Sequence, residues 1–227
     1  SDWSIEIFQR NYIKNALVDC KDDDIILLSD VDEFAAPELL QQVKDGLGEV
    51  HIFSTFERVA EREGLRGLSR NARCFFRALP YMGKRSSIRE FLRYSPVVCE
   101  QTMYNFFINY RRDSNWCGLI LAEYGQIVDM QKLRSRRNQF PLVYGGWHFS
   151  SLGGLKMIRN KINSTSDGMC NPIYGLPEED QNQVIEEALE KGYIWWRDEY
   201  LKKRTLEDMD IPWIEWFAKK YPYMYHG

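Results

Sequence analysis

The order of apolar and polar residues along the chain predicts alternating helices and strands. Apolar residues recur at helical spacing between positions 3 and 19, which predicts an amphipathic helix. A continuous apolar run at 25–28 follows, and such a run is typical of a strand buried on both faces of a largely parallel sheet. Pro37 then opens a helix, at a position where proline is tolerated. The pattern predicts an α/β fold, in which ligands bind beyond the carboxyl ends of the strands.

The rest of the chain continues this alternation. Strand-like segments lie at 50–56, 119–122 and 142–150, and a helix is predicted at about 152–163. Pro177 begins an acidic helix that Gly192 ends, and a Trp- and Tyr-rich helix follows near the C-terminus. We expect one domain over residues 1–227, with a helical C-terminal region at 178–227.

Residues 49–96 differ from their surroundings because basic residues recur every few positions. These residues are Arg58, Arg62, Arg66, Arg70, Arg73, Arg77, Lys84, Arg85, Arg89 and Arg93. We expect an inserted arginine-rich arm. It is either a solvated charged face or a binding surface for an anionic acceptor, such as a phosphate-bearing lipid or polysaccharide, or an acidic membrane surface.

Composition narrows the classes of function. The 227 residues carry a formal net charge of −3 and are 44% hydrophobic, which is ordinary for a soluble protein and not typical of a nucleic-acid binder. No apolar run is long enough to span a membrane. The five cysteines are scattered and predict neither a zinc site nor a disulfide framework, so we expect a reducing compartment.

The most informative motif is the acidic tip, Ser29-Asp30-Val31-Asp32-Glu33, which follows the apolar run. Asp30 and Asp32 can both reach a divalent cation if the backbone turns between them. Mg²⁺ and Mn²⁺ prefer oxygen ligands and commonly share their shell with substrate phosphates. The alternative is an acidic turn that only caps the helix at Pro37.

His148 and Lys161 are the other candidates. His148 lies between two aromatic residues in a segment that begins with two glycines, and its imidazole could complete a metal shell or could be a satisfied core residue. Lys161 follows on the next predicted helix, where its ammonium could meet a phosphate or lie free on the surface.

Several separated motifs together resemble glycosyltransferase family 17. They are Trp3-x-x-Glu6-x-x-x-Arg10-Asn11-x-Ile13, Asp24-Ile25-Ile26-x-x-Ser29-Asp30-Val31-Asp32-Glu33, Tyr104, Trp116-x-Gly118, Leu133-Arg134, and Gly146-Trp147-His148-Phe149-Ser150 with Gly153-Gly154 and Lys161. This family includes the enzyme that adds the bisecting N-acetylglucosamine to glycoproteins. The resemblance covers residues 3–48 and about 97–165, and residues 49–96 depart from it.

The resemblance implies a GT-A fold whose first nucleotide-binding strand is absent from this chain, and an inverting transfer from a UDP-sugar with Mn²⁺ or Mg²⁺. It assigns the metal to Asp30, Asp32 and His148. It places Arg10, Asn11, Ser29 and Lys161 at the nucleotide sugar. The transferred sugar would be N-acetylglucosamine or a related hexose, and the acceptor a glycan or another hydroxyl compound. We expect a cytoplasmic enzyme of bacterial or viral type, or a Golgi enzyme if the chain is eukaryotic.

An inverting transfer also needs a carboxylate that takes the proton of the acceptor hydroxyl. Glu33, Glu123 and Asp129 are candidates: Glu33 belongs to the acidic tip, where it could instead brace the metal site, and Glu123 follows a predicted strand. Two other classes of function remain open. One is a carbohydrate-binding relative that kept the fold without catalysis, and the other is a metal-dependent nucleotidyltransferase that uses the same carboxylates.

Overall fold

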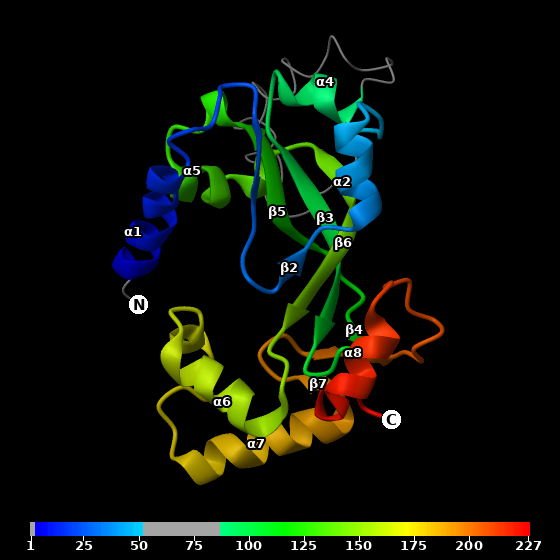
Figure 1. Cartoon of the computed structure of the whole chain (residues 1–227). Coiled ribbons are helices and arrows are strands. Elements are labelled where there is room, and N and C mark those ends of the chain that lie inside the picture. Colours follow the sequence, from blue (N-terminus) through cyan, green and yellow to red (C-terminus); the bar gives the residue numbers. More distant parts are fainter. Residues whose placement is uncertain (1–2, 52–86) are drawn as a thin grey trace, which may run out of the picture. The chain divides into compact units, whose positions relative to one another are not determined.

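The computed structural model describes residues 3–51 and 87–227, which form a mixed α/β structure (Figure 1). The chain divides into two compact units. The N-terminal unit comprises Ser4–Gln101 and Trp116–Trp147, and the C-terminal unit comprises Ser1–Trp3, Thr102–Asn115 and His148–Gly227. Most of the expected arginine-rich arm, at positions 52–86, lies outside the described residues.

The N-terminal unit contains four α-helices and five strands among its described residues. The helices are α1 (Ser4–Tyr12), α2 (Pro37–Lys44), α4 (Ile88–Leu92) and α5 (Met130–Ser135). The strands are β1 (Ile25–Leu28), β2 (Glu33–Phe34), β3 (Val97–Asn105), β5 (Trp116–Glu123) and β6 (Leu142–Ser150), of which β3 and β6 end in the C-terminal unit. Short 3-10 helices lie at Ile13–Ala16, Tyr124–Gln126 and Arg137–Gln139.

The prediction of a mostly parallel sheet is wrong. The sheet is mostly antiparallel, with one parallel pair, and β5 pairs antiparallel with both β1 and β3. The apolar run in β1 suggested a strand buried on both faces, but β1 lies at the end of the strand order and Leu27 is 39% exposed. The fully buried run is in β5, where Cys117–Ala122 lie between two neighbouring strands.

The core of this unit lies around β5. Leu28, Val98 and Ile120 from three adjacent strands pack with Met130 and Leu133 of α5. One buried polar residue ties further strands together. Gln101 donates its amide to the backbone carbonyls of Phe34 and Trp147, at 3.0 and 3.2 Å.

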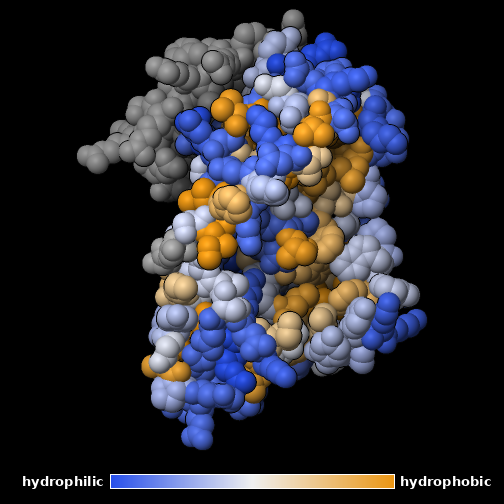
Figure 2. All heavy atoms as spheres, turned by 60° about the vertical axis from the view of Figure 1, so that its left-hand side comes forward, coloured by the Kyte–Doolittle hydropathy of each residue, from blue (hydrophilic) through white to orange (hydrophobic). Residues whose placement is uncertain are grey.

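Helix α1 faces the unit with its polar side. Arg10 and Asn11 make side-chain contacts with α5, whereas Ile5, Phe8 and Tyr12 are 67%, 66% and 60% exposed. Figure 2, in which the side of Figure 1 that carries α1 comes forward, shows apolar side chains at the surface among hydrophilic ones. The amphipathic pattern at 3–19 therefore predicted a helix correctly but implied the opposite face toward the core.

The C-terminal unit combines helices with short strands. Its helices are α6 (Gly154–Ser164), α7 (Glu178–Lys191) and α8 (Ile214–Lys220), with 3-10 helices at Gly168–Cys170 and Pro222–Met224. Its own strands are β4 (Tyr110–Arg111), β7 (Tyr193–Ile194), β8 (Glu199–Tyr200) and β9 (Lys202–Lys203), and β4 pairs with β3 and β9. Ile158 and Ile162 of α6 pack with Ile185 and Ala188 of α7. No helix in the described part of the chain is both long and apolar enough to cross a membrane.

Candidate functional site

The acidic tip lies where β1 ends. Ser29 and Asp30 follow Leu28, and a turn closed by a hydrogen bond from the Glu33 N–H to the Asp30 carbonyl leads into β2. The side chain of Asp30 is 42% exposed, and Asp32 is half-buried. The tip therefore presents carboxylate oxygens at the end of a strand, as the sequence predicted.

Glu33 points inward from the tip and is fully buried. Its Oε1 accepts a hydrogen bond from the Trp116 indole N–H at 2.6 Å, and its Oε2 accepts one from the Asp30 N–H at 3.1 Å. Both oxygens also accept hydrogen bonds from Arg134. Because every one of these contacts holds the carboxylate in place, the geometry favours a bracing role for Glu33 over that of a general base.

Arg134 joins Glu33 to Asp30. It comes from α5, and its side chain is 4% exposed. Its Nη2 lies 2.6 Å from Asp30 Oδ2, and its Nη1 donates to the carbonyl of Gly118. Burial alone would lower the pKa of Arg134, but the hydrogen bonds and charge attraction from Glu33 and Asp30 raise that pKa above its ordinary value. This guanidinium is therefore a permanent buried cation behind the tip.

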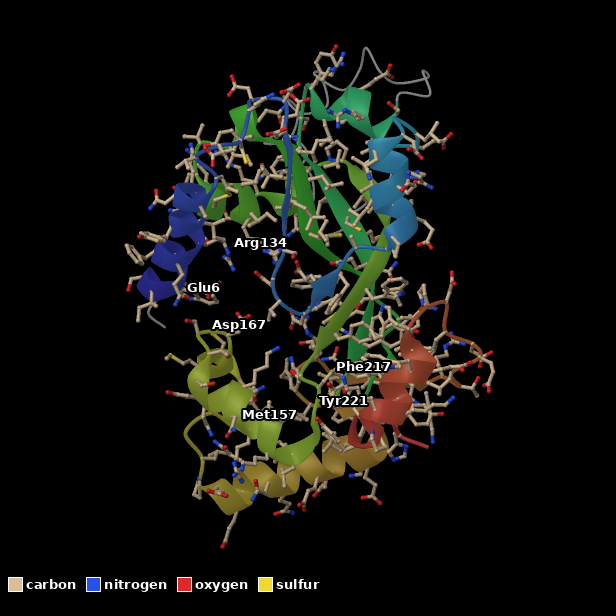
Figure 3. All side chains as sticks on the ribbon, in the orientation of Figure 1. Glu6, Arg134, Met157, Asp167, Phe217 and Tyr221 are labelled. Carbon is tan, nitrogen blue, oxygen red and sulfur yellow. The ribbon has the colours of Figure 1, made fainter. Side chains whose placement is uncertain are left out.

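Arg10 approaches Asp30 from the other side. Its Nη2 lies 3.1 Å from Asp30 Oδ1 and 2.8 Å from Glu6, and its Nη1 donates to Gln131 at 2.6 Å. Figure 3 labels Glu6 on α1 and Arg134 on α5. The structure thus brings Arg10 to the acidic tip, and its contact with a nucleotide sugar stays a prediction.

Asn11 and Asp129 hold α1 against α5. The Asn11 amide donates to Asp129 at 3.0 Å and its oxygen accepts from the Gln131 N–H at 2.9 Å. Asp129 is also the N-cap of α5, where it accepts the Lys132 N–H at 2.6 Å. Both residues therefore have structural roles that explain their presence next to the site.

Glu123 lies at the far end of β5 from the acidic tip. In the antiparallel register Ile25 pairs with Glu123 and Leu28 with Ile120, so Glu123 lies beside the start of β1. Arg134 donates hydrogen bonds to both the Gly118 carbonyl and Asp30, so Gly118 marks the end of β5 near the tip. Glu123 is five residues from Gly118 along the strand, or ~17 Å at ~3.4 Å per residue. The choice of Glu123 as base assumed that both strands end at one edge, and the antiparallel pairing removes that reason.

Trp116, Gly118 and Arg134 are site residues to which the sequence analysis assigned no role. All three belong to the motifs quoted above. Gly118 is required because a Cβ there would lie 2.1 Å from Glu33 Oε1 and 2.4 Å from the Trp116 indole nitrogen. Arg137 lies over the Trp116 ring, 5.1 Å from its centre. Burial and the nearby charge of Arg134 lower the pKa of Arg137. The spacing of a Trp and a Gly two residues apart was the available signal.

His148 and Lys161 belong to the C-terminal unit, whereas Asp30 and Asp32 belong to the N-terminal unit. His148 is buried in β6, next to Phe149, whose ring stacks on Tyr104 at 5.2 Å. The Lys161 ammonium lies 3.4 Å from the Ser150 hydroxyl. The roles of His148 as a metal ligand and of Lys161 as a contact of the nucleotide sugar stay predictions.

Both oxygens of the Asp30 carboxylate already accept hydrogen bonds, one from Arg10 and one from Arg134. No group of three His, Cys, Asp or Glu side chains converges within residues 3–51 and 87–227. Asp30 and Asp32 therefore offer two carboxylates, and magnesium often binds through one or two carboxylates together with substrate phosphates. Carboxylate oxygen is the donor type that such a cation prefers, and its remaining ligands would have to come from a diphosphate or water.

Comparisons with known protein families, with curated proteins and with solved structures found no match to this chain.

Proposed function

We propose that this chain is a metal-dependent glycosyltransferase with a GT-A-like donor site. It would transfer N-acetylglucosamine or a related hexose from a UDP-sugar to a glycan or another hydroxyl acceptor, with inversion. The observation that carries the proposal is the half-exposed Asp30 carboxylate at the end of β1, backed by buried Arg134 and Glu33 and followed by Asp32. The ordered motifs that resemble glycosyltransferase family 17 support the same conclusion.

The roles of the chain's residues follow from their positions. Asp30 and Asp32 would hold Mn²⁺ or Mg²⁺, which neutralises the charge that develops on the leaving diphosphate. Arg10 places a second positive charge beside Asp30, where it can donate to a phosphate oxygen. Ser29 precedes Asp30 on the same tip. The assignment of His148 to the metal and of Lys161 to the nucleotide sugar rests on the family resemblance alone. The reaction would take place in the cytoplasm, or in the Golgi lumen of a eukaryotic cell.

A donor screen tests this function. The protein is incubated with UDP-, GDP- and dTDP-sugars, with and without Mn²⁺, and both thermal stabilisation and release of the nucleoside diphosphate are measured. We expect metal-dependent stabilisation and slow hydrolysis with a UDP-sugar. D30N and D32N should reduce hydrolysis to background, while D45N, which changes an exposed aspartate of the same unit, should not.

The outcomes separate the three classes of function. Binding of sugars without donor hydrolysis or transfer would indicate a carbohydrate-binding relative. Consumption of nucleoside triphosphates without use of sugar nucleotides would indicate a nucleotidyltransferase. Full hydrolysis by D30N or D32N would refute the assignment of the metal to the acidic tip.

A further inference from the structure

The acidic tip is not held by its own turn alone, because the buried carboxylate of Glu33 and the exposed carboxylate of Asp30 both bind the guanidinium of Arg134. Arg134 contacts Asp30 and Glu33 from α5, about a hundred residues further along the chain. We propose that Arg134 is the positioning residue of the tip and fixes Asp30 in the orientation that binds the cation and diphosphate. This inference rests on the proposed function.

The first argument is the geometry of the guanidinium. Its two terminal nitrogens together reach four acceptors, which are Asp30 Oδ2 at 2.6 Å, Glu33 Oε2 at 3.0 Å, Glu33 Oε1 and the Gly118 carbonyl. A planar group with this many partners has one orientation. A lysine ammonium is a point charge on a flexible stem and cannot reproduce that fork.

The three charged side chains differ in how deeply they are buried. Glu33 and Arg134 have 0% and 4% of their side chains exposed, whereas Asp30 has 42%. The inner pair is thus enclosed, and Asp30 is the member of the group that a ligand can reach. Residues that hydrogen-bond to a metal ligand from behind orient that ligand, and their loss typically lowers metal affinity by about 10- to 100-fold.

A positioning role for Arg134 and simple charge repulsion predict opposite changes in Mn²⁺ affinity when Arg134 is removed. Arg134 is a positive charge next to Asp30, so charge repulsion alone would make its removal strengthen Mn²⁺ binding. If Arg134 positions Asp30, its removal must weaken binding in spite of the lost repulsion.

The experiment measures Mn²⁺ affinity in the presence of UDP by electron paramagnetic resonance and calorimetry, together with melting temperature. We compare the wild type with R134K, which keeps the charge but loses the fork, and R134M, which loses both. R136M is the matched control, because Arg136 is exposed and follows α5 directly. We expect R134K and R134M to lose at least roughly ten-fold in affinity, and R136M to match the wild type.

A second variant covers the case in which R134M fails to fold with an unpaired Glu33. E33Q/R134M removes both buried charges, and the new amide oxygen can still accept the Trp116 N–H. Replacing both partners of a buried ion pair is often tolerated, so we expect a folded protein that still binds Mn²⁺ and UDP weakly.

The results separate the two proposals. Wild-type affinity in folded E33Q/R134M, or tighter Mn²⁺ binding by R134M, would overturn the positioning role while leaving the proposed function in place. A wild-type protein that binds neither Mn²⁺ nor UDP would overturn both.

Discussion

Gly118 is the position at which a single methyl group should disturb the whole site. It lies in β5, and a Cβ added there would be 2.1 Å from Glu33 Oε1. An ordinary van der Waals contact is ~3.4 Å or more, so Glu33 must move by about 1.3 Å. A shift of that size is large enough to carry the 2.6 Å bond from Trp116 and the 3.0 Å bond from Arg134 beyond hydrogen-bonding distance.

The cost of Gly118→Ala can be worked from these contacts. Breaking one side of a buried ion pair costs about 3–5 kcal/mol. Replacing glycine by alanine returns about 0.4–1 kcal/mol, because the unfolded chain loses freedom. The net loss is about 2–4.6 kcal/mol, which for a chain of this size lowers the melting temperature by roughly 4–18 °C.

The assay is urea unfolding followed by tryptophan fluorescence, which should report on Trp116 next to the substituted residue. Gly125→Ala is the control, because the three atoms nearest to its Cβ would all belong to the exposed Asp22, at 3.0 Å or more. We expect the control to stay within about 0.5 kcal/mol of the wild type. If G118A is as stable as G125A, the close packing of Glu33 on β5 is not what holds the tip.

Two further predictions concern other residues of the N-terminal unit. Glu123→Gln should leave donor hydrolysis and transfer within about two-fold of the wild type, because Glu123 lies at the other end of β5 from Asp30; a large fall in kcat would restore it as a candidate base. Burial, followed by the neighbouring Cys117 and Glu33, raises the pKa of the Cys99 thiol, so its thiolate is suppressed. Iodoacetamide should therefore label exposed Cys170 but not Cys99 in the native protein between about pH 7 and 9, and mass spectrometry showing equal labelling would contradict this.

The sequence predicted the acidic tip because the signal is local. Asp30 and Asp32 directly follow an apolar run, and a strand followed by a turn needs only neighbouring residues to form. Strand direction is not local. The run in β1 was compatible with a parallel or an antiparallel partner, and the choice of Glu123 depended on that direction.

The residues that complete the site come from distant segments. Arg134 was visible only as part of a quoted motif, since nothing in its neighbours says that it turns inward toward Asp30. Arg10 lies on the polar face of α1, which an amphipathic pattern assigns to solvent. Hydrophobic periodicity assumes that apolar faces are buried, and here the hydrogen bonds of Arg10 and Asn11 reverse that orientation.

The reversed orientation of α1 has a consequence for how the unit opens. A helix that is attached through hydrogen bonds and ion pairs, with Ile5 and Phe8 in water, gains little from apolar burial. Its nine residues are too few for a stable isolated helix. Local opening of α1 should therefore need much less free energy than opening β5, and rising salt should lower it further. Arg10 would leave Asp30 each time α1 detaches, which makes the positive charge beside Asp30 depend on ionic strength.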